Sequence, residues 1–360
     1  MKKTPMDIKK SGFDKWFSDQ TDSVKPAEYE IARVTAVNKD SFQIRNREKD
    51  VLAEMTGKML FNADSPAEFP TVGDWVHARF YDNESFAVIH EIIPRKSLLK
   101  RKTAGRKTEY QLIAANIDTA FIVQSFGSDY NLRRLERYLV MVNEGNIQPV
   151  ALLSKSDLST EDERNQKIAE IQTLMPDIQI VEFSNINHHG INRIKEMLIP
   201  EKTFCLLGSS GTGKTTLLNN LMDEDVFETN AVRKKNGKGK HTTTRRQLIR
   251  LKNGAMMIDT PGMREIGNIA VSAGINETFN EINALSEQCL YHNCSHTNEK
   301  GCAIRQGLEE GTLSEERYLN FVKMSKETAH NEMSYFEKRR KDKNFAKLCK
   351  SVMKNKQRKR

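Results

Sequence analysis

The sequence contains a glycine-rich segment whose residue types and spacing suit phosphate binding. Gly208-Ser-Ser-Gly-Thr-Gly-Lys-Thr215 fits the pattern G-x-x-x-x-G-K-[ST] and lies between an apolar run that predicts a strand and a stretch that predicts a helix. Glycine lets backbone amides approach phosphate oxygens where a Cβ would block them, and a helix N-terminus adds partial positive charge. We expect Lys214 to reach the β- and γ-phosphates and the Thr215 hydroxyl to ligate Mg²⁺. The whole predicted set is Gly208, Ser209, Ser210, Gly211, Thr212, Gly213, Lys214, Thr215 and Thr216.

An acidic turn farther along the chain extends this expected site. Asp259-Thr-Pro-Gly262 ends the apolar run GAMMID, which predicts a strand. A carboxylate at a strand end beside a phosphate loop suits outer-sphere binding of Mg²⁺, and the Gly262 amide can sense a γ-phosphate. The two segments together predict a site for a nucleoside triphosphate with magnesium.

The segment Ser154-Lys155-Ser156-Asp157 follows the apolar run QPVALL and could select the base. GTPases usually carry N-K-x-D here, and the Asp accepts hydrogen bonds from N1 and N2 of guanine. Adenine lacks both donors, so a buried carboxylate would stay unpaired against ATP. Ser154 replaces the Asn, which shortens or removes the tie to the base and the phosphate loop, so we expect guanine preference with weaker binding. Ser184 and Asn185 follow the next expected strand, and the Asn185 amide could hold the guanine oxygen.

Four residues near the C-terminal end have the spacing of a metal site. Cys289, Cys294, His296 and Cys302 read C-x₄-C-x-H-x₅-C, and three thiolates with one imidazole match a closed structural zinc site. The surrounding segment is too short to bury a large core, so one zinc ion would supply folding energy. His292 is an alternative ligand. An odd total of five cysteines is not a disulfide framework, which fits a cytoplasmic protein.

Periodicity divides the chain into parts of different fold class. Residues 29–93 read as five short alternating strands, which suits a small closed barrel of the OB type. From residue 112, strands alternate with helices, which predicts a parallel α/β sheet covered on both faces. Beyond residue 275 the pattern is helical and polar, and Thr312 with Glu315 predicts a capping box. The expected parts are a loosely held polar N-terminal arm (1–26), an OB-fold (27–94), a basic linker (95–111), a P-loop domain (112–273), a zinc-binding helical domain (274–337) and a basic C-terminal tail (338–360).

Positive charge is concentrated in three short runs. The formal net charge is +9, but residues 338–360 carry 12 Lys or Arg and one acid, which leaves −2 for the rest of the chain. Residues 95–107 and 231–246 each hold seven Lys or Arg and no acid. Basic runs beside a near-neutral body predict contact with a polyanion, most simply RNA. No apolar run reaches the ~18 residues of a spanning helix, so we expect no membrane contact.

The order of these segments is unusual for a GTPase. The base segment (154–157) precedes the phosphate loop (208–215), whereas ordinary GTPases have the phosphate loop first. The chemistry survives this circular permutation because it depends on where loops meet at the carboxyl edge of the sheet. Several stretches resemble the RsgA family of circularly permuted, ribosome small subunit-dependent GTPases. They are PRKSLLKRKTAG (94–105), IAANIDTAFIV (113–123), NLRRLERYL (131–139), GKGKHTTT (237–244), DTPGMRE (259–265) and the Cys/His cluster.

The resemblance runs from about residue 28 to the C-terminus. It implies an OB-fold, a circularly permuted P-loop GTPase domain and a mostly helical zinc-binding domain. It also implies late maturation of the small ribosomal subunit in the cytoplasm, with GTP and GDP, the subunit and its rRNA as partners of a monomeric protein. Ser154 departs from the family, as does Asn185, where the family often has Ala; both departures concern nucleotide affinity.

The residue that orients the attacking water is the least defined part of the expected site. Many GTPases place a Gln just after D-x-x-G, but this chain has Met263 there, so we expect slow unaided hydrolysis. His241 in GKGKHTTT is the best substitute, because a neutral imidazole can position or deprotonate water. Contact with RNA or simple packing is the alternative role for His241. One of Thr242, Thr243 and Thr244 is the expected second ligand of Mg²⁺, and Thr243 is the first choice.

The residues predict a GTP phosphohydrolase, and the resemblance implies that it binds the small ribosomal subunit, is stimulated by it and is released on hydrolysis. An RNA-binding module that uses nucleotide only for stability stays open because of Met263. An ATP-dependent phosphotransferase also stays open, although Asp157 argues against it. The OB domain, the 95–107 run and the tail are the expected RNA contacts. Candidates for base stacking, most of them expected to be core, are Phe42, Trp75, Phe80 and Phe86.

Overall fold

The structure is a computed structural model that describes residues 6–21, 28–38, 41–46, 49–63, 65–102, 110–127, 129–222, 246–259 and 272–332. The chain divides into two compact units. The first consists of Met1–Arg101 and Tyr110–Ile266, and the second of Lys102–Glu109 and Gly267–Arg360. Among the helices of the described residues, none is both long and apolar enough to cross a membrane.

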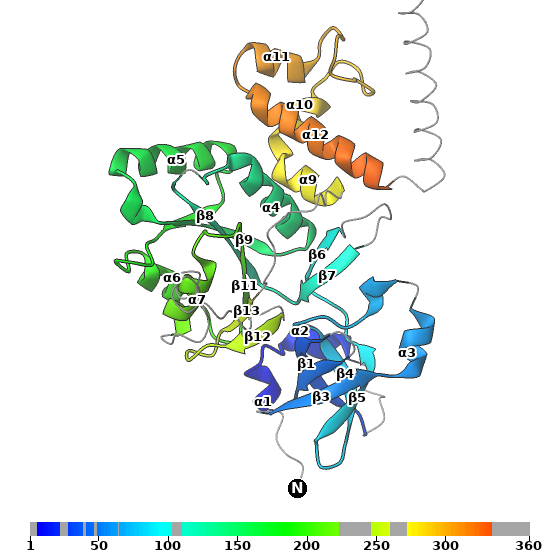
Figure 1. The fold of residues 1–360 in the computed structure, drawn as a ribbon. Helices are drawn as coiled ribbons and strands as arrows, with labels where there is room; N and C mark the ends of the chain where they lie inside the picture. The colour runs from blue at the N-terminus through cyan, green and yellow to red at the C-terminus, as the bar shows by residue number, and fades with distance from the viewer. Residues whose placement is uncertain are drawn as a thin grey trace, which may run out of the picture. The chain divides into compact units, whose positions relative to one another are not determined.

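The first unit contains a closed five-stranded barrel (Figure 1). The strands pair in the order β1-β2-β3-β5-β4, and β4 pairs back with β1. Neighbours are antiparallel except β3 and β5, which are parallel. This topology confirms the OB-type barrel predicted from the alternating pattern. The elements are β1 (Glu30–Val37), β2 (Phe42–Arg45), β3 (Asp50–Met55), α3 (Gly57–Asn62), a 3₁₀ turn (Pro66–Glu68), β4 (Trp75–Tyr81) and β5 (Phe86–Ile92).

Alternation along the strands fills the barrel with small and branched side chains. Ala32 and Val34 of β1 pack with Ile44 of β2 in one core cluster. Most of the aromatic candidates for base stacking belong to the interior as well. Phe42 and Trp75 are buried, and Phe80 packs against the core cluster, so these three rings are structural.

The N-terminal residues are bound to the barrel, contrary to the prediction of a loosely held polar arm. Helices α1 (Met6–Lys9) and α2 (Lys15–Gln20) precede β1, and Asp14 caps α2 by accepting from the backbone N–H of Trp16. Phe13 and Phe17 are buried against Trp75, with ring centroids 4.9 and 6.0 Å from it. The prediction was wrong for residues 6–21 because two aromatic anchors outweigh a polar composition.

The rest of the first unit is an α/β sheet with the order β10-β9-β8-β11-β13-β12. All strands are parallel except β12, which pairs antiparallel with β13. The strands are β8 (Thr119–Ser125), β9 (Gln148–Ser154), β10 (Gln179–Glu182), β11 (Thr203–Leu207), β12 (Gln247–Arg250) and β13 (Met256–Asp259). The helices are α4 (Leu132–Glu144), α5 (Glu161–Leu174), α6 (Ile191–Met197) and α7 (Lys214–Met222).

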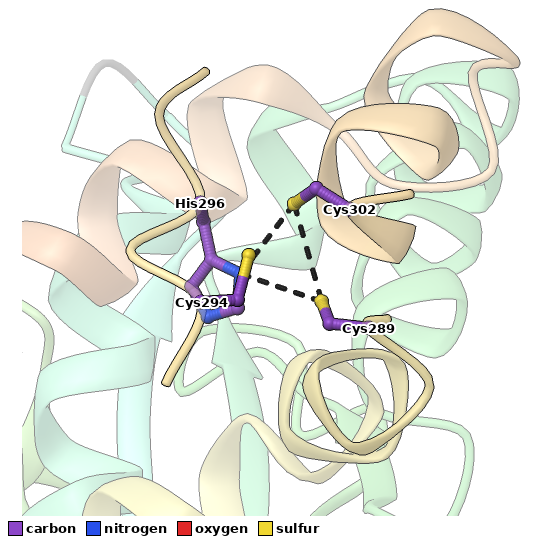
Figure 2. A group of neighbouring side chains, drawn as sticks. All are labelled: Cys289, Cys294, His296 and Cys302. Atoms are coloured by element: carbon purple, nitrogen blue, oxygen red, sulfur yellow. Dashed lines mark hydrogen bonds between the residues drawn. The ribbon is translucent and has the colours of Figure 1, made fainter. Parts of the chain in front are cut away.

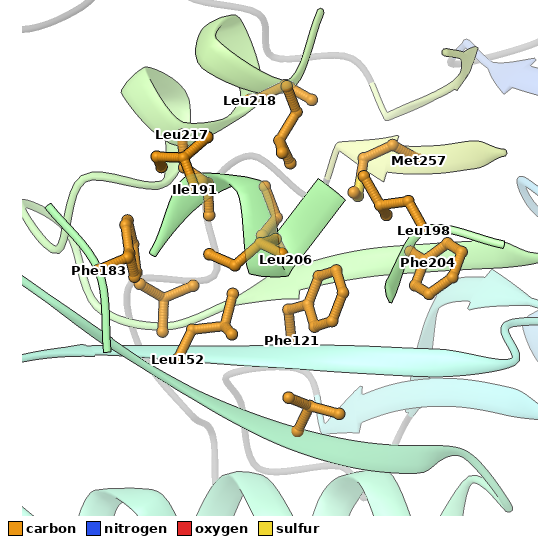
Figure 3. Close-up of a cluster of buried hydrophobic side chains, with 14 of the residues drawn as sticks. Phe121, Leu152, Phe183, Ile191, Leu198, Phe204, Leu206, Leu217, Leu218 and Met257 are labelled. Carbon is orange, nitrogen blue, oxygen red and sulfur yellow. The ribbon is translucent and has the colours of Figure 1, made fainter. Parts of the chain in front are cut away.

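A large apolar cluster holds α6 and α7 against this sheet. Phe121, Leu152 and Phe204 of the strands meet Ile191 of α6 and Leu217 of α7 (Figure 3). Helix α4 packs against β8 and β9 through a strongly amphipathic face. The strands therefore end in fixed positions, and the loops at their carboxyl ends share one edge of the sheet.

The barrel and the sheet are joined by a shared strand pairing. β12 pairs with β13 on one side and with β1 on the other, where Gln247 lies opposite Ala36. The two modules thus form one continuous 11-stranded sheet. A separate two-stranded sheet connects them along the chain, formed by β6 (Leu98–Lys102) and β7 (Tyr110–Ala115).

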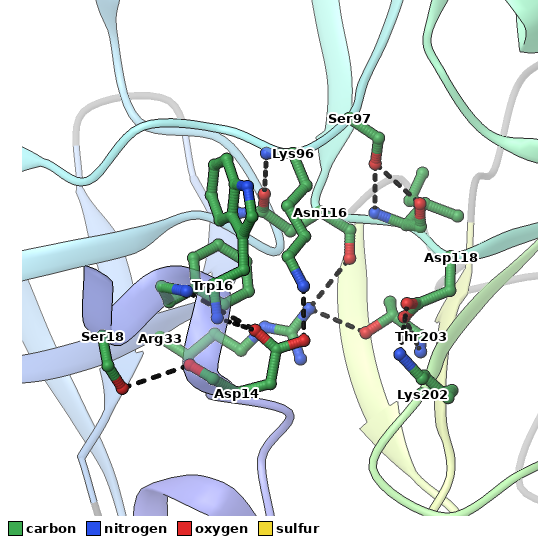
Figure 4. Close-up of polar contacts among 12 residues, drawn as sticks. Asp14, Trp16, Ser18, Arg33, Lys96, Ser97, Asn116, Asp118, Lys202 and Thr203 are labelled. Atoms are coloured by element: carbon green, nitrogen blue, oxygen red, sulfur yellow. Dashed lines mark hydrogen bonds and ion pairs between the residues drawn. The ribbon is translucent and has the colours of Figure 1, made fainter. Parts of the chain in front are cut away.

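A buried arginine reinforces this joint (Figure 4). Arg33 of β1 is 2% exposed, and its guanidinium donates to Thr203 Oγ1 of β11 at 2.8 Å and to the Ser11 carbonyl at 2.5 Å. It also donates to the carbonyls of Gly73 and Asn116, each at 3.3 Å. Burial lowers the pKa of Arg33 to about 10, although the negative charges of Asp118 and Asp74 act to raise it. One side chain therefore cross-links barrel, N-terminal segment and sheet.

The second unit is a small helical module. Phe279, Ile282 and Ile304 are buried, and the Arg317 guanidinium lies over the Phe279 ring and pairs with Glu281. Its helices are α9 (Ser272–Thr278), α10 (Asn280–Glu287), α11 (Ala303–Glu309) and α12 (Glu315–Glu332).

The predicted capping box at the start of α12 is wrong. The Thr312 hydroxyl donates to the Gly307 carbonyl at the end of α11, and α12 begins only at Glu315. A cap at Thr312 would require the helix to begin at the following residue. The local pattern was overridden by a hydrogen bond to the preceding helix.

Replacing Arg33 by Met should lower the free energy of unfolding by at least about 2 kcal/mol, because buried carbonyls lose their donors. Urea denaturation followed by tryptophan fluorescence measures this. Arg79→Met is the matched control, since the Arg79–Glu28 pair is about half exposed and should cost less than about 1 kcal/mol. Equal losses for the two variants would contradict the role assigned to Arg33.

Candidate functional site

The phosphate loop lies where β11 ends and α7 begins. Its backbone takes conformations that favour glycine, with φ of 142° at Gly208, 84° at Gly211 and 89° at Gly213. A Cβ at Gly208 would lie 2.3 Å from the carbonyl oxygen of Val123 on β8, so only glycine fits there. The loop is built to present backbone amides, as phosphate binding requires.

Two cations contact this loop. Lys214 Nζ donates to the carbonyl oxygens of Gly208 at 2.7 Å and Ser209 at 2.5 Å, which holds the ammonium over the loop. Arg134 of α4 donates to the Ser209 hydroxyl at 2.7 Å. Thr215 is exposed at the start of α7. The site therefore has positive charge where phosphates would lie and an accessible hydroxyl beside it.

Ser154 connects the predicted base segment to the phosphate loop. It ends β9, is fully buried, and its hydroxyl lies 2.7 Å from the Thr212 carbonyl oxygen and 3.1 Å from that of Gln124. A hydroxyl has one proton, so it donates to one carbonyl at a time, and the Thr212 contact is the shorter. The tie to the phosphate loop is thus retained by Ser154, although the sequence predicted that it would be shortened or lost.

The rest of the base segment is held so that one carboxylate stays accessible. Lys155 has a left-handed φ of 61°, and the chain turns there into a 3₁₀ turn (Ser156–Leu158). The backbone N–H of Ser156 donates to the Phe183 carbonyl at 3.2 Å. The Arg164 guanidinium of α5 donates to the Ser156 carbonyl at 3.4 Å. Asp157 itself is exposed. Its carboxylate can accept hydrogen bonds from a ligand.

The third loop, after β10, also contacts the phosphate loop. Asn185 Nδ2 donates to the Gly213 carbonyl at 3.1 Å, and its Oδ1 accepts from Asn220 at 3.0 Å. The buried Ser184 hydroxyl accepts from the backbone N–H of Ile186 at 3.1 Å. Both side chains therefore help to hold this loop in place, and Asn185 keeps one N–H donor that these contacts do not use.

Asp259 is the last residue of β13, and it interacts with the charge of Lys214. Burial raises the pKa of Asp259 to about 6, although the positive charge of Lys214 opposes that rise. The Asp259 carboxylate and the exposed Thr215 hydroxyl carry oxygen donors of the kind that Mg²⁺ prefers. Three other predicted site residues, His241, Thr243 and Gly262, lie outside the described residues.

The Cys/His cluster of the second unit converges on one point (Figure 2). Cys289 follows α10, Cys302 precedes α11, and Cys294 and His296 come from the loop between them. The Nδ1 atom of His296 lies 3.6 Å from Cys289 Sγ and 3.5 Å from Cys302 Sγ, and these two sulfurs are 4.0 Å apart. All four ligand atoms lie within 4.8 Å of one another.

These distances fit a tetrahedral metal ion. Bonds of about 2.3 Å to sulfur and about 2.0 Å to nitrogen place sulfurs about 3.8 Å apart and sulfur about 3.5 Å from nitrogen. The pKa of the Cys289 thiol lies below its ordinary value. Burial raises this pKa, but hydrogen bonds from the backbone N–H groups of Ala303 and Ile304 lower it, and their effect exceeds that of burial. The cluster can therefore hold a metal ion. The alternative ligand His292 is not part of it.

Comparison with known proteins identifies the family. The family model described as RsgA GTPase matches residues 92–269. The chain is 38% identical over 312 residues to "Small ribosomal subunit biogenesis GTPase RsgA 2" of Lactiplantibacillus plantarum, which covers 86% of this chain and 87% of that relative. It is 34% identical over 353 residues to the RsgA 2 of Vibrio vulnificus, covering 98% and 97%. This chain belongs to the RsgA GTPase family.

Solved structures agree with this RsgA assignment. YjeQ from Thermotoga maritima matches with a TM-score of 0.62 and 26% identity over 84% of this chain and 99% of that chain. YloQ, described as a circularly permuted GTPase, matches with a TM-score of 0.59 over 88% and 100%, and at 21% identity it supports the fold alone. The resemblance and the circularly permuted order predicted from the sequence are confirmed.

The structure also shows residues of this RsgA chain that sequence analysis missed. Arg134 holds the phosphate loop through Ser209, and Arg164 braces the base segment. Neither belongs to a nucleotide motif, since each acts from a helix that packs beside the site. Arg134 lies within the stretch NLRRLERYL, whose resemblance to the family was the only available signal.

Replacing Asp259 by Asn should stabilise the nucleotide-free protein above pH 6. The pKa of Asp259 in the folded state is about 6, above the ordinary 3.8. Ionisation of Asp259 therefore lowers the free energy of unfolding as the pH rises from about 4 to about 6. Above pH 6 the loss stays constant at up to about 3 kcal/mol. Urea denaturation at pH 4.5 and 7.5 tests this, with the exposed Asp162→Asn as control. A gain of the same size at both pH values would contradict it.

Replacing Cys302 by Ser should lower both metal content and the stability of the helical module, because the site joins the loop to α11. Elemental analysis of the purified chain and thermal unfolding followed by circular dichroism provide the two readouts. His292→Ala is the control, since His292 is exposed and lies outside the cluster. A variant that keeps its metal would show that Cys302 is not a ligand.

Proposed function

We propose that this chain is a GTP phosphohydrolase that acts in biogenesis of the small ribosomal subunit, the process named for its relatives. The observation that carries the nucleotide assignment is the convergence of three loops. Ser154 and Asn185 are hydrogen-bonded to Thr212 and Gly213, two consecutive residues of the phosphate loop. A base held by one loop would therefore lie at a fixed distance from phosphates held by another.

The proposed roles follow from these positions. Asp157 accepts from the guanine edge, Lys214 faces the β- and γ-phosphates, and the backbone of the loop binds phosphate oxygens. Mg²⁺ bound with GTP would neutralise charge on the β- and γ-phosphates. Thr215 and Thr243 are its proposed ligands. The remaining proposed contacts are those of Lys155, Ser156, Ser184, Ser209, Ser210, Gly208, Gly211, Thr216, Asp259 and Gly262.

The catalytic assignment is made from the sequence. Met263 cannot orient water, so unaided hydrolysis is slow and His241 is the proposed catalytic residue. Binding of the small subunit would complete the site and raise the rate, and hydrolysis to GDP and phosphate would release the factor. The alternative is an RNA-binding module that binds nucleotide without hydrolysing it. Such a protein would show no GTP turnover, with or without the small subunit.

The proposal extends to cofactor, organisation and partners. Three thiolates and one imidazole are the donor set of a structural zinc ion, which would stabilise the helical module. The proposed limits are 27–94 for the OB-fold, 112–273 for the GTPase domain and 274–337 for the zinc-binding domain. We assign the protein as a cytoplasmic monomer that binds rRNA of the small subunit, with the basic tail 338–360 as one contact.

GTP turnover with and without purified small ribosomal subunits tests the proposal. Wild type should hydrolyse GTP slowly alone and at least about tenfold faster with subunits. Asp157→Asn should lose the preference for GTP over ATP, because one of the two acceptor oxygens that face the guanine donors becomes an NH₂ donor. Asp162→Asn, an exposed Asp on α5, is the matched control. Turnover that subunits leave unchanged would contradict the proposed function, and absent turnover would favour the binding module.

A further inference from the structure

Three of the described cations of the basic run 95–107 are used inside the protein. Arg95 pairs with the buried Asp74 at 2.8 Å, Lys96 pairs with Asp14, and Lys100 lies 3.6 Å from Glu144. These cations are neutralised by carboxylates of the same unit. They are therefore poor candidates for contact with an external polyanion, although the sequence predicted such contact for the whole run.

Arg101 on β6 is different from its neighbours. Its Nε donates to Gln111 Oε1 on the facing strand β7 at 3.0 Å, and no carboxylate among the described residues pairs with it. Its side chain is half-buried. The guanidinium is thus placed by a neutral amide, which leaves its full charge and most of its N–H groups available.

A second arginine lies close to Arg101. Arg246 is the last residue of the basic run 231–246, and its Nη1 donates to the carbonyl of Leu112 at 2.6 Å, next to Gln111 on β7. The pKa of Arg246 is lowered to about 10, mainly by burial and to a smaller extent by the positive charge of Arg101. Strand β7 thus gathers one cation from each of two basic runs that lie far apart in the sequence.

Two half-buried cations side by side are unfavourable unless an anion joins them. Within the described part of the chain, Arg246 also forms no ion pair with a carboxylate. Two guanidinium groups with free N–H donors have the geometry that binds a tetrahedral phosphate. The two arginines therefore form a candidate site for an anion.

We propose that Arg101 and Arg246 together bind a backbone phosphate of ribosomal RNA. The inference rests on the proposed function, from which the class of polyanion follows. The barrel is a less suitable surface for an RNA backbone, because residues 27–94 carry 12 Asp or Glu and only seven Lys or Arg. Arg101 and Arg246 are held by neutral partners, Gln111 and the Leu112 carbonyl, and form no ion pair with a carboxylate among the described residues.

The position of Arg246 would couple RNA binding to the nucleotide site. The next residue, Gln247, begins β12 and lies opposite Asp259 of β13 on one side and Ala36 of the barrel on the other. A phosphate that fixes Arg246 would also fix the start of β12. The strand that ends at Asp259 would then be held in one position when the subunit is bound.

Co-sedimentation with purified small ribosomal subunits over a range of KCl concentrations tests the site with the full chain. Arg101→Gln and Arg246→Gln should each weaken binding about tenfold and reduce the slope of log affinity against log salt by about one. The double variant should lose little more than one single variant, because both side chains hold one phosphate. Arg305→Gln, whose arginine pairs with Glu309, is the control and should keep the wild-type slope.

The outcomes separate this site from the proposed function. Wild type that does not bind subunits would overturn both, whereas normal wild-type binding with unchanged variant slopes would overturn this site alone. Weaker binding with an unchanged slope would indicate a protein contact and would also overturn it. The ratio of stimulated to unaided GTP turnover should fall at least about fivefold in Arg246→Gln, with each variant's own unaided rate as reference.

Thermal unfolding excludes a merely structural role. Arg246→Gln removes the charge that Arg101 repels, which offsets the lost hydrogen bond to the Leu112 carbonyl, so its midpoint should change little from that of wild type. Inorganic phosphate at constant ionic strength should raise the midpoint of wild type more than that of the variant if a free anion suffices. A variant that unfolds at lower temperature, with its salt slope unchanged, would assign Arg246 to folding and not to RNA.

Discussion

The hydrogen bonds that tie two loops to the phosphate loop are the constraint on which the nucleotide site depends. Parallel strands bring β9, β10 and β11 to one edge of the sheet, but strands alone fix only the starting points of their loops. The Ser154 hydroxyl and the Asn185 amide fix the distance between base segment and phosphate loop. These hydrogen bonds depend on which loops lie close together and not on the order of the loops in the sequence. The arrangement of the three loops is therefore kept in a circularly permuted chain.

Circular permutation has a structural consequence in this RsgA chain. Strand β12 lies between β13, which ends at Asp259, and β1 of the barrel. Arg33 adds a buried link from β1 to Thr203 of β11, the strand that leads into the phosphate loop. The barrel is thus part of the same sheet as the strands that lead to Asp259 and to the phosphate loop, and hydrogen bonds join the two modules.

Sequence reasoning succeeded where spacing determines chemistry. The glycine positions, the carboxyl-edge loops and the Cys/His spacing follow from local geometry, so the barrel, the permuted sheet and the metal cluster could all be predicted. It failed where partners are distant. Phe13 needs Trp75, and Arg95 needs Asp74, and neither partner can be found by period or motif. Ser154 was underestimated because its bond to Thr212 is made by the loop after β11, which reaches past β8 to the end of β9.

Isothermal titration calorimetry of the metal-replete full chain with GTP and with ATP, each with Mg²⁺, tests the central claim most directly. Wild type should bind GTP and release little heat with ATP. Ser154→Ala should bind GTP about fivefold to tenfold more weakly, because one hydrogen bond between the loops is lost. Equal affinity for the two nucleotides, or Ser154→Ala binding as tightly as wild type, would contradict a pocket held together by that hydroxyl.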